Sequence, residues 1–314
     1  MYVRPGLLSL VLIALLGCAD QKSNVPVHVE SVLRVAPVPV VFELPGLRQY
    51  ALGDWRRDGM RTPTPGTLLM GGGKEVPSSF RWFAERAGGG RLLILRASGD
   101  DDLQHLLYEQ FGGFSAVRTL VFSGRQPAFE PEVADVISQA DAVFIAGGDQ
   151  ARYLRFWKGT PVQQLLNAHV QSGKPIGGTS AGLAVLGGWV YGALDDGSID
   201  SPSALANPLG EAVTLEREFL QVPFLRGVVT DTHFAQRDRQ GRLLAFVNKA
   251  GSLSGDPVYG LGVDEDAALA VEANGIARLH RLDPAHMAWV IAPQLPAQGL
   301  VAGQGLEQRD VTVI

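Results

Sequence analysis

Residues 177–182, which read Gly-Gly-Thr-Ser-Ala-Gly, constrain the fold of this chain more than any other segment. They follow the short run 174–176 and precede small and apolar residues at 183–186. Glycine two positions before and two positions after a serine permits a sharp turn from a strand into a helix, because side chains there would collide with neighbouring backbone. Such a turn exposes the hydroxyl of Ser180 and directs backbone N–H groups toward whatever that oxygen attacks. Taken alone, the motif is compatible with a catalytic nucleophile or with a flexible turn.

Length and composition predict a globular protein. The chain has 314 residues, of which 46% are hydrophobic, enough for the core of one large domain or two small ones. Its formal net charge is −5 and the sequence contains no basic run, so we expect no nucleic-acid partner.

The first residues have the pattern of an export signal. Arg4 precedes the apolar segment 7–16, which is too short to span a bilayer and suits the hydrophobic region of a signal peptide. Residues 15–18, Leu-Leu-Gly-Cys, resemble the bacterial lipobox, in which the cysteine is acylated and becomes the first residue of the mature protein. We therefore expect a lipoprotein signal peptide at 1–17 and a lipid anchor on Cys18. A plain signal peptide and an uncleaved hydrophobic tail are the alternatives.

This interpretation sets the expected location and domain plan. The protein would be exported and anchored to a membrane of the bacterial cell envelope, facing the periplasm or the exterior. Cys18 is the sole cysteine, which excludes a disulfide within the chain. Residues 18–66 are interpreted as a tether or N-terminal extension, with an added edge element as one option, and residues 67–314 as the main domain.

From residue 67 onward, short apolar runs alternate with amphipathic ones. Strands are expected at 67–70, 91–97, 117–122 and 142–146, and helices at about 101–111 and 131–139. This alternation predicts an α/β fold with a mainly parallel central sheet and helices on both faces. Asn274-Gly275 joins two strand-like runs at 267–273 and 276–279 and predicts a hairpin, so the C-terminal strands should be antiparallel.

Functional residues should lie in the loops that follow the strands, since sites in such sheets form beyond the carboxyl ends of the strands. Three loops stand out: 147–150 (Gly-Gly-Asp-Gln), the Ser180 turn, and 231–234 (Asp-Thr-His-Phe). Each follows an apolar run, so we expect them to converge. The segment 191–223 has no clear period and is interpreted as an excursion that forms part of the pocket wall.

A serine hydroxyl needs a base to remove its proton, and histidine is the usual choice. Of the six histidines, His233 is the one that directly follows a buried-looking strand, although a satisfied core or surface histidine is the alternative. The group that orients the imidazole is expected at the end of another short strand, where Asp264 and Glu265 are both candidates. The order serine, histidine, acid differs from the serine, acid, histidine order of α/β-hydrolases.

Other chemistries lack their residues. The only cysteine lies in the predicted export signal, which excludes catalysis by a thiol in the main domain. The sequence has no HExxH helix, no paired His and Cys cluster and no GxxxxGK[ST] loop, so we expect neither a metal nor a cofactor. Residues 71–74, Gly-Gly-Gly-Lys, are interpreted as a turn at the end of a strand.

Three arginines follow His233 closely, at Arg237, Arg239 and Arg242. A guanidinium group is a planar fork that binds carboxylates with two hydrogen bonds, which favours a substrate bearing carboxylates if these groups face the pocket. The alternative is a solvated helix start whose charge is partly neutralised by Asp238.

These residues resemble a family of serine peptidases that includes cyanophycinase and the aspartyl dipeptidase peptidase E. Residues 178–182 match the serine elbow of that group, and residues 233–242 are similar to the HFSQRxRxGR segment of cyanophycinases. Residues 147–150 resemble the family's GG[DN]Q loop, and residues 262–265 resemble the segment that supplies the acid. The resemblance runs from about residue 67 to residue 271.

The resemblance implies a flavodoxin-like sandwich, related to class I glutamine amidotransferases, and a role for each matching position. Ser180 would be the nucleophile, His233 the general base and Glu265 the orienting acid, with the N–H groups of Ala181 and Gly148 as oxyanion hole. The substrate pocket would be formed by Gln150, Asp231, Thr232, Arg237, Arg239 and Arg242. Thr232 stands where cyanophycinases usually carry glutamine, and Leu183 where a smaller residue is common.

The function expected from this resemblance is that of a serine exopeptidase that hydrolyses β-aspartyl or related acidic peptides through an acyl-enzyme. An α-aspartyl dipeptidase and a non-catalytic envelope lipoprotein of the same fold are the alternatives. The expected partners are a peptide substrate bearing carboxylates, the lipid membrane and, as one option, a second copy of the chain.

Overall fold

The computed structural model describes residues 42–313, except for 57, 196, 293–299 and 307–310. The expected signal peptide and Cys18 lie outside the described residues. Among the helices of the described part, none is both long and apolar enough to cross a membrane. Val38–Ile314 groups as one unit, to which the following description applies.

A large eight-stranded sheet has the order β1-β4-β3-β5-β6-β2-β11-β12. The strands from β4 to β2 in this order are parallel, whereas β1 at one edge and β11 and β12 at the other are antiparallel to their neighbours. The bounds are β1 Leu47–Gly53, β2 Gly66–Met70, β3 Arg91–Arg96, β4 Ala116–Phe122, β5 Ala142–Ile145, β6 Ile176–Thr179, β11 Ala267–Glu272 and β12 Ala277–Arg281. The predicted mainly parallel sheet with antiparallel C-terminal strands is confirmed.

Helices cover both faces of this sheet because successive strand residues point to opposite faces. In β2, Leu68 and Met70 belong to the same buried cluster as Phe80 and Phe83 of α1, whereas Leu69 joins the cluster on the other face. One face carries α1 (Pro77–Arg86), α2 (Asp102–His105) and the π-helix η1 (Leu106–Phe111). The other face carries the 3-10 helix η2 (Gln126–Phe129), α3 (Pro131–Gln139), α4 (Gln150–Trp157) and α5 (Pro161–Gln171).

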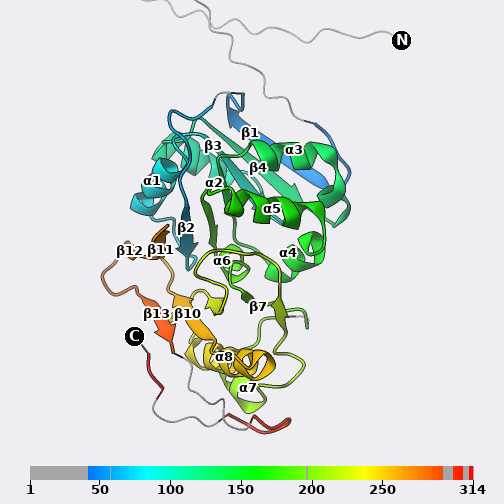
Figure 1. Cartoon of the computed structure of the whole chain (residues 1–314), viewed down its shortest axis with the longest axis vertical. Coiled ribbons are helices and arrows are strands. Elements are labelled where there is room, and N and C mark those ends of the chain that lie inside the picture. The colour runs from blue at the N-terminus through cyan, green and yellow to red at the C-terminus, as the bar shows by residue number, and fades with distance from the viewer. Residues whose placement is uncertain (1–41, 57, 196, 293–299, 307–310, 314) are drawn as a thin grey trace, which may run out of the picture. The chain divides into compact units, whose positions relative to one another are not determined.

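A second sheet of five strands, in the order β13-β10-β9-β7-β8, lies beside α7 and α8 (Figure 1). Its strands β10, β9 and β7 are parallel, and the two edge strands are antiparallel. The bounds are β7 Trp189–Tyr191, β8 Leu215–Arg217, β9 Val228–Asp231, β10 Tyr259–Val263, β13 Ala288–Ile291, α7 Ser201–Ala206 and α8 Gln240–Ser254. The sequence indicated that the β9 and β10 segments are strands, but short apolar runs report burial and do not identify the partner strand.

The two sheets are connected through the short helix α6 (Ala181–Ala184), which directly follows β6. A Cβ atom at Gly182 would lie 1.9 Å from the carbonyl oxygen of Ile145, and one at Gly178 would lie 2.5 Å from the carbonyl carbon of Gly182. From the other side, the hydroxyl of Thr230 in β9 donates to the carbonyl oxygen of Leu183 at 3.0 Å. The predicted need for glycine on both sides of Ser180 is therefore confirmed, since backbone occupies the space of a side chain.

Other expected elements lie where the sequence places them, with one difference in helix type. The expected helix at 131–139 coincides with α3, and Gly275 forms the β11–β12 turn with a φ of +83°. The expected helix at 101–111 begins as α2 and continues as the π-helix η1. Within the segment interpreted as a tether or edge element, β1 pairs with β4 along its whole length.

We predict that Gly182→Ala strongly destabilises the fold. The added methyl group would collide with the backbone of β5, and overpacking of this kind lowers the free energy of unfolding by about 1–3 kcal/mol. Denaturant unfolding of Gly182→Ala should be compared with that of Gly124→Ala, because a Cβ atom at Gly124 would enter open space. Equal stability of the two variants would contradict the packing argument.

Candidate active site

Ser180 occupies the turn between β6 and α6 in a strained conformation. Its φ is 51° and its ψ −120°, a region that residues other than glycine rarely adopt. The backbone N–H of Ser180 donates to the carbonyl oxygen of Met70 at 3.1 Å, which ties the turn to the neighbouring strand β2. The elbow thus presents the hydroxyl beyond the carboxyl end of the large sheet.

His233 reaches Ser180 from the second sheet. It lies two residues beyond the end of β9, and its N–H donates to the carbonyl oxygen of Gly71 at 2.8 Å. Its ring nitrogen Nε2 is 2.7 Å from Oγ of Ser180, within hydrogen-bond distance. The loops of two different sheets therefore bring a hydroxyl and an imidazole into contact, as expected from the sequence.

Glu265 completes the set of three side chains. Its Oε1 is 2.6 Å from Nδ1 of His233, on the opposite side of the ring from Ser180. Asp264 points elsewhere, is 1% exposed, and accepts hydrogen bonds from the N–H groups of Ala235 and Met287 and from Nε1 of Trp289. Of the two acids left open by the sequence, Glu265 thus contacts the histidine, and Asp264 anchors the loop that carries it.

The glycine triplet after β2 supports this arrangement, although the sequence indicated only a turn at the end of a strand. A Cβ atom at Gly72 would lie 2.3 Å from Cε1 of His233, and one at Gly71 would lie 2.0 Å from the carbonyl oxygen of Asp264. The N–H of Asp266 donates to the carbonyl oxygen of Gly72 at 2.9 Å. A triplet of glycines directly after a buried strand was the available signal for this close approach.

A cavity of about 450 Å³ opens beside Ser180. It is lined by Ser180, His233, Gly148 and Ala181, together with the expected pocket residues Gln150, Asp231, Thr232, Arg237, Arg239 and Arg242. Gly148 has a φ of +146°, and Tyr153 fixes its loop by donating to the carbonyl oxygens of Ala146 and Gly147 at 2.7 and 3.0 Å. The loop after β5 and the start of α6 therefore border the same cavity as Ser180.

The three arginines differ in what they bind. Arg242 is 2% exposed and pairs with the carboxylate of Asp231 through Nε and Nη2, at 2.8 and 2.5 Å. Its Nη1 donates to Ser198 at 2.6 Å and to the carbonyl oxygen of Ile199 at 3.0 Å. All three guanidinium nitrogens of Arg242 thus already bind protein atoms, so its contribution to the cavity is to hold the wall and Asp231.

One end of the Arg239 guanidinium group is held by Thr232. Its Nη1 donates to the carbonyl oxygen of Thr232 at 2.9 Å and to the hydroxyl of Thr232 at 3.1 Å. Within the described part of the chain, its Nε and Nη2 make no hydrogen bond. Burial lowers the pKa of Arg239 to about 10, so the group stays protonated at neutral pH. Arg237 is more exposed, and its Nε lies 4.0 Å from Oε1 of Glu265.

The electrostatic surroundings of His233 favour the neutral ring. Burial lowers its pKa below the ordinary value of 6.5, and the positive charges of Arg237 and Arg239 act in the same direction. The hydrogen bond and the negative charge of Glu265 act against them. The imidazole is therefore neutral at neutral pH and able to accept a proton from Ser180.

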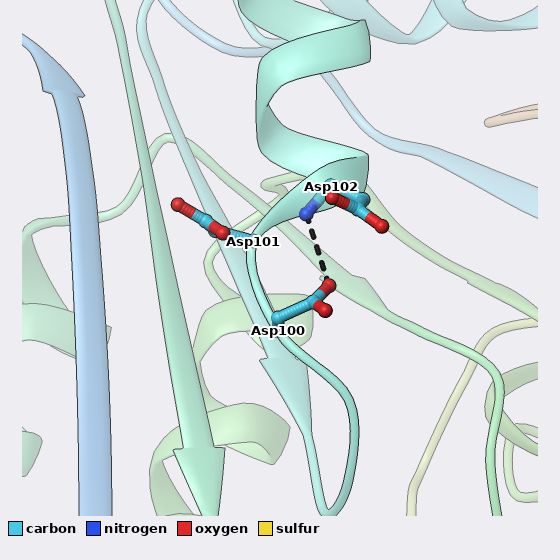
Figure 2. A group of neighbouring side chains, drawn as sticks. All are labelled: Asp100, Asp101 and Asp102. Carbon is cyan, nitrogen blue, oxygen red and sulfur yellow. Dashed lines mark hydrogen bonds between the residues drawn. The ribbon is translucent and has the colours of Figure 1, made fainter.

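Within the described residues, one cluster has the donor set for a cation: Asp100, Asp101 and Asp102, with carboxylate oxygens within 4.8 Å of one another. Figure 2 shows Asp100 and Asp102 on one side of their loop and Asp101 on the other. The carboxylate of Asp100 accepts the N–H of Asp102 at 3.3 Å, and Asp101 lies 3.3 Å from Nε2 of His105. Acids at the start of a helix stabilise its positive end, which accounts for the cluster without a metal.

Comparison with known proteins identifies the family. The profile of peptidase family S51 matches residues 107–279, which is more than half of the chain. The chain belongs to peptidase family S51. This agrees with the resemblance carried by the serine elbow and by the segment that begins at His233.

Relatives and solved structures agree with this assignment. A cyanophycinase of Synechococcus elongatus is 32% identical over 205 residues, covering 63% of this chain and 58% of the relative. A cyanophycinase of Trichormus variabilis is 28% identical over 233 residues, covering 69% of this chain and 72% of the relative. The crystal structure of a peptidase from an acI-B1 actinobacterium, 18% identical, superposes with a TM-score of 0.51 over 79% of this chain and 98% of its own, which supports the fold.

We predict that kcat/KM of any reaction that uses His233 as the base decreases at pH values below 6.5. The acidic limb of kcat/KM should report the pKa of the free histidine, which burial and the nearby arginines lower. Arg237→Gln removes one of these positive charges and should raise that pKa, moving the acidic limb to higher pH. Arg81→Gln, at an exposed position of α1, serves as the control. A shift to lower pH in Arg237→Gln would contradict this account.

Proposed function

We propose that this chain is a serine peptidase that hydrolyses β-aspartyl or related acidic peptides through an acyl-enzyme. The observation that carries the proposal is the continuous contact from Oγ of Ser180 to Nε2 of His233 at 2.7 Å, and from Nδ1 of His233 to Glu265 at 2.6 Å. Membership of a peptidase family supports it. The chain spans 58% of the length of the Synechococcus cyanophycinase, so the substrate is inferred here from the cavity.

In the proposed acylation step, Oγ of Ser180 attacks the carbonyl carbon of the scissile amide while Nε2 of His233 accepts the hydroxyl proton. Glu265 stabilises the resulting imidazolium through its contact with Nδ1. The carbonyl oxygen becomes an oxyanion, which the N–H groups of Ala181 and Gly148 at the cavity wall would bind. The imidazolium then gives its proton to the leaving nitrogen as the C–N bond breaks.

Deacylation repeats these steps with water. His233 takes a proton from the water molecule, whose oxygen attacks the ester carbonyl of the acyl-enzyme. Collapse of the second tetrahedral intermediate returns the proton to Oγ of Ser180 and releases the acid product. The depressed pKa of His233 supports this step, because only the neutral ring can act as the base.

The charges of the cavity support an acidic acyl group. Four guanidinium groups and two carboxylates line it, those of Arg155, Arg237, Arg239, Arg242, Asp149 and Asp231. Asp231 is bound by Arg242 through two short hydrogen bonds and lies 3.5 Å from Nη1 of Arg239, so Nε and Nη2 of the buried Arg239 are the donors that can receive a substrate carboxylate. We therefore assign carboxylate recognition to Arg239, assisted by Arg237 at the more exposed rim.

The choice between β- and α-linked aspartyl substrates depends on the wall near Thr232. Its hydroxyl accepts a hydrogen bond from Arg239, so threonine supplies an orienting contact where cyanophycinases usually carry an amide side chain. An α-aspartyl dipeptidase activity is thus the second candidate. Chromatography of the products from α-linked and β-linked aspartyl peptides would distinguish them.

We predict that Ser180→Ala abolishes hydrolysis of the preferred aspartyl peptide, with kcat lowered by three orders of magnitude or more. The loss follows from removal of the attacking oxygen, and the fold should persist because only one hydroxyl is lost. Turnover and labelling by a fluorophosphonate should be measured alongside Ser138→Ala, an exposed serine on α3. Full turnover by Ser180→Ala, or equal labelling of both variants, would refute the proposed nucleophile.

Substitution of Arg239 should change substrate binding, whereas substitution of Arg242 should change the stability of the fold. Arg239→Ala should raise KM for carboxylate-bearing substrates about tenfold or more, since a hydrogen bond to a charged group contributes roughly 1.5–3 kcal/mol. Arg242→Ala should instead lower the free energy of unfolding by about 3–5 kcal/mol, because it removes both short ionic hydrogen bonds of the buried Asp231 carboxylate and leaves Arg239, at 3.5 Å, as its remaining cationic partner. Steady-state kinetics and denaturant unfolding of both variants test this division of roles between the two arginines. An unchanged KM in Arg239→Ala would show that Arg239 does not bind the substrate carboxylate.

A further inference from the structure

The side chain of Gln236 binds the backbone of the residue whose carboxylate contacts His233. Its Oε1 accepts a hydrogen bond from the N–H of Glu265 at 2.9 Å. Gln236 lies three residues beyond His233, among arginines that line the cavity, but it is not itself part of the cavity lining. The substrate site therefore gives no reason for a glutamine at this position, whereas the contact with Glu265 does.

Two hydrogen bonds of opposite direction join the segment after His233 to the loop after β10. The N–H of Ala235 donates to the carboxylate of Asp264 at 2.9 Å, from the histidine segment to the acid loop. The N–H of Glu265 donates to the side chain of Gln236, from the acid loop back to the histidine segment. The backbone that carries the histidine and the backbone that carries its acid are thus tied to each other twice.

The residue after Glu265 is held from a third direction. Asp266 donates through its N–H to the carbonyl oxygen of Gly72 at 2.9 Å, and its carboxylate accepts the N–H of Lys74 at 2.6 Å. Among the described residues, Gln236 is the partner of the N–H of Glu265 itself. Because the peptide group is planar, holding this N–H fixes the peptide plane from which the side chain of Glu265 begins.

We propose that Gln236 is a positioning residue that directs the carboxylate of Glu265 at Nδ1 of His233. This inference rests on the proposed function. The distance of 2.6 Å between Oε1 and Nδ1 is that of a strong charge-assisted hydrogen bond, which a small displacement or rotation weakens. The side chain of Glu265 is 33% exposed, so packing alone does not hold it at this distance.

Loss of the glutamine oxygen should affect catalysis more than folding. Gln236 is exposed, so water can replace its side chain as acceptor and the free energy of unfolding should change little, but water does not hold the loop in one orientation. Burial lowers the pKa of His233, and Arg237 and Arg239 act in the same direction. The contact with Glu265 acts against them, so a looser contact lowers the pKa further.

Gln236→Met tests this role, because methionine is also long and unbranched but lacks the amide oxygen. We expect kcat to decrease about three- to tenfold with KM unchanged, since neither Arg239 nor the oxyanion hole is altered. The acidic limb of kcat/KM should move to lower pH, opposite to the shift expected for Arg237→Gln. Denaturant unfolding of the same variant should give nearly the wild-type stability.

Two further variants serve as rescue and control. Gln236→Glu keeps an oxygen acceptor and should have kcat near the wild-type value, with its acidic limb at or above the wild-type pH because the added negative charge raises the pKa of His233. Gln240→Met makes the same substitution at an exposed position of α8 and should match the wild-type protein in kcat and in pH profile.

A proton NMR spectrum gives a readout that does not require turnover. A proton held between Nδ1 of His233 and a carboxylate oxygen at 2.6 Å resonates far downfield. We expect this signal in the wild-type protein and in Gln240→Met, and we expect it to move upfield or to be lost by exchange in Gln236→Met.

The outcomes separate this inference from the function on which it rests. An unchanged kcat and acidic limb in Gln236→Met overturns the positioning role and leaves the peptidase assignment standing. A lower kcat with an unmoved limb also overturns it, because a purely structural defect reduces the active fraction equally at every pH. Absence of turnover by the wild-type protein overturns the proposed function, and an unchanged downfield signal in Gln236→Met would then overturn the positioning role independently.

Discussion

Close approach of glycine backbones is the constraint on which the site depends. At Gly182 the helix after Ser180 lies against the carbonyl of Ile145, and at Gly72 the loop after β2 lies against the ring of His233, at spacings that leave no room for a methyl group. The first contact allows the elbow to form at the end of the large sheet. The second allows a histidine from the other sheet to reach the serine. Larger side chains at these glycines would separate the hydroxyl from the imidazole.

The site residues were predictable from the sequence where catalytic chemistry and backbone geometry require the same residue types. The glycines around Ser180, the single histidine after a buried strand and the acids at 264–265 were all recognisable, and the structure brings Ser180, His233 and Glu265 together. The sequence alone could not distinguish Asp264 from Glu265 as the partner of His233. Adjacent side chains point in different directions, and which of them faces the histidine depends on how the loop is anchored.

The remaining differences are long-range. The second sheet was missed because apolar runs of four or five residues do not encode their partners, and the glycine triplet was undervalued because its neighbours in space come from residues 233 and 264–266. In the same way, three arginines in one segment look equivalent in the sequence. Two short hydrogen bonds to Asp231 make the buried Arg242 part of the framework, whereas Arg239, three residues earlier, lines the cavity and binds Thr232 through Nη1.

Placing a general base beside guanidinium groups creates a conflict that Glu265 moderates. In the proposed mechanism, positive charge would attract a carboxylate substrate but would disfavour the imidazolium formed when Ser180 attacks. The carboxylate of Glu265, 2.6 Å from Nδ1, stabilises that imidazolium where it arises, while burial and the arginines keep the resting ring neutral. In the proposed function, the carboxylate of a bound acidic substrate would offset the arginine charge and make the histidine a stronger base. Substrate charge would thus contribute to proton transfer as well as to binding.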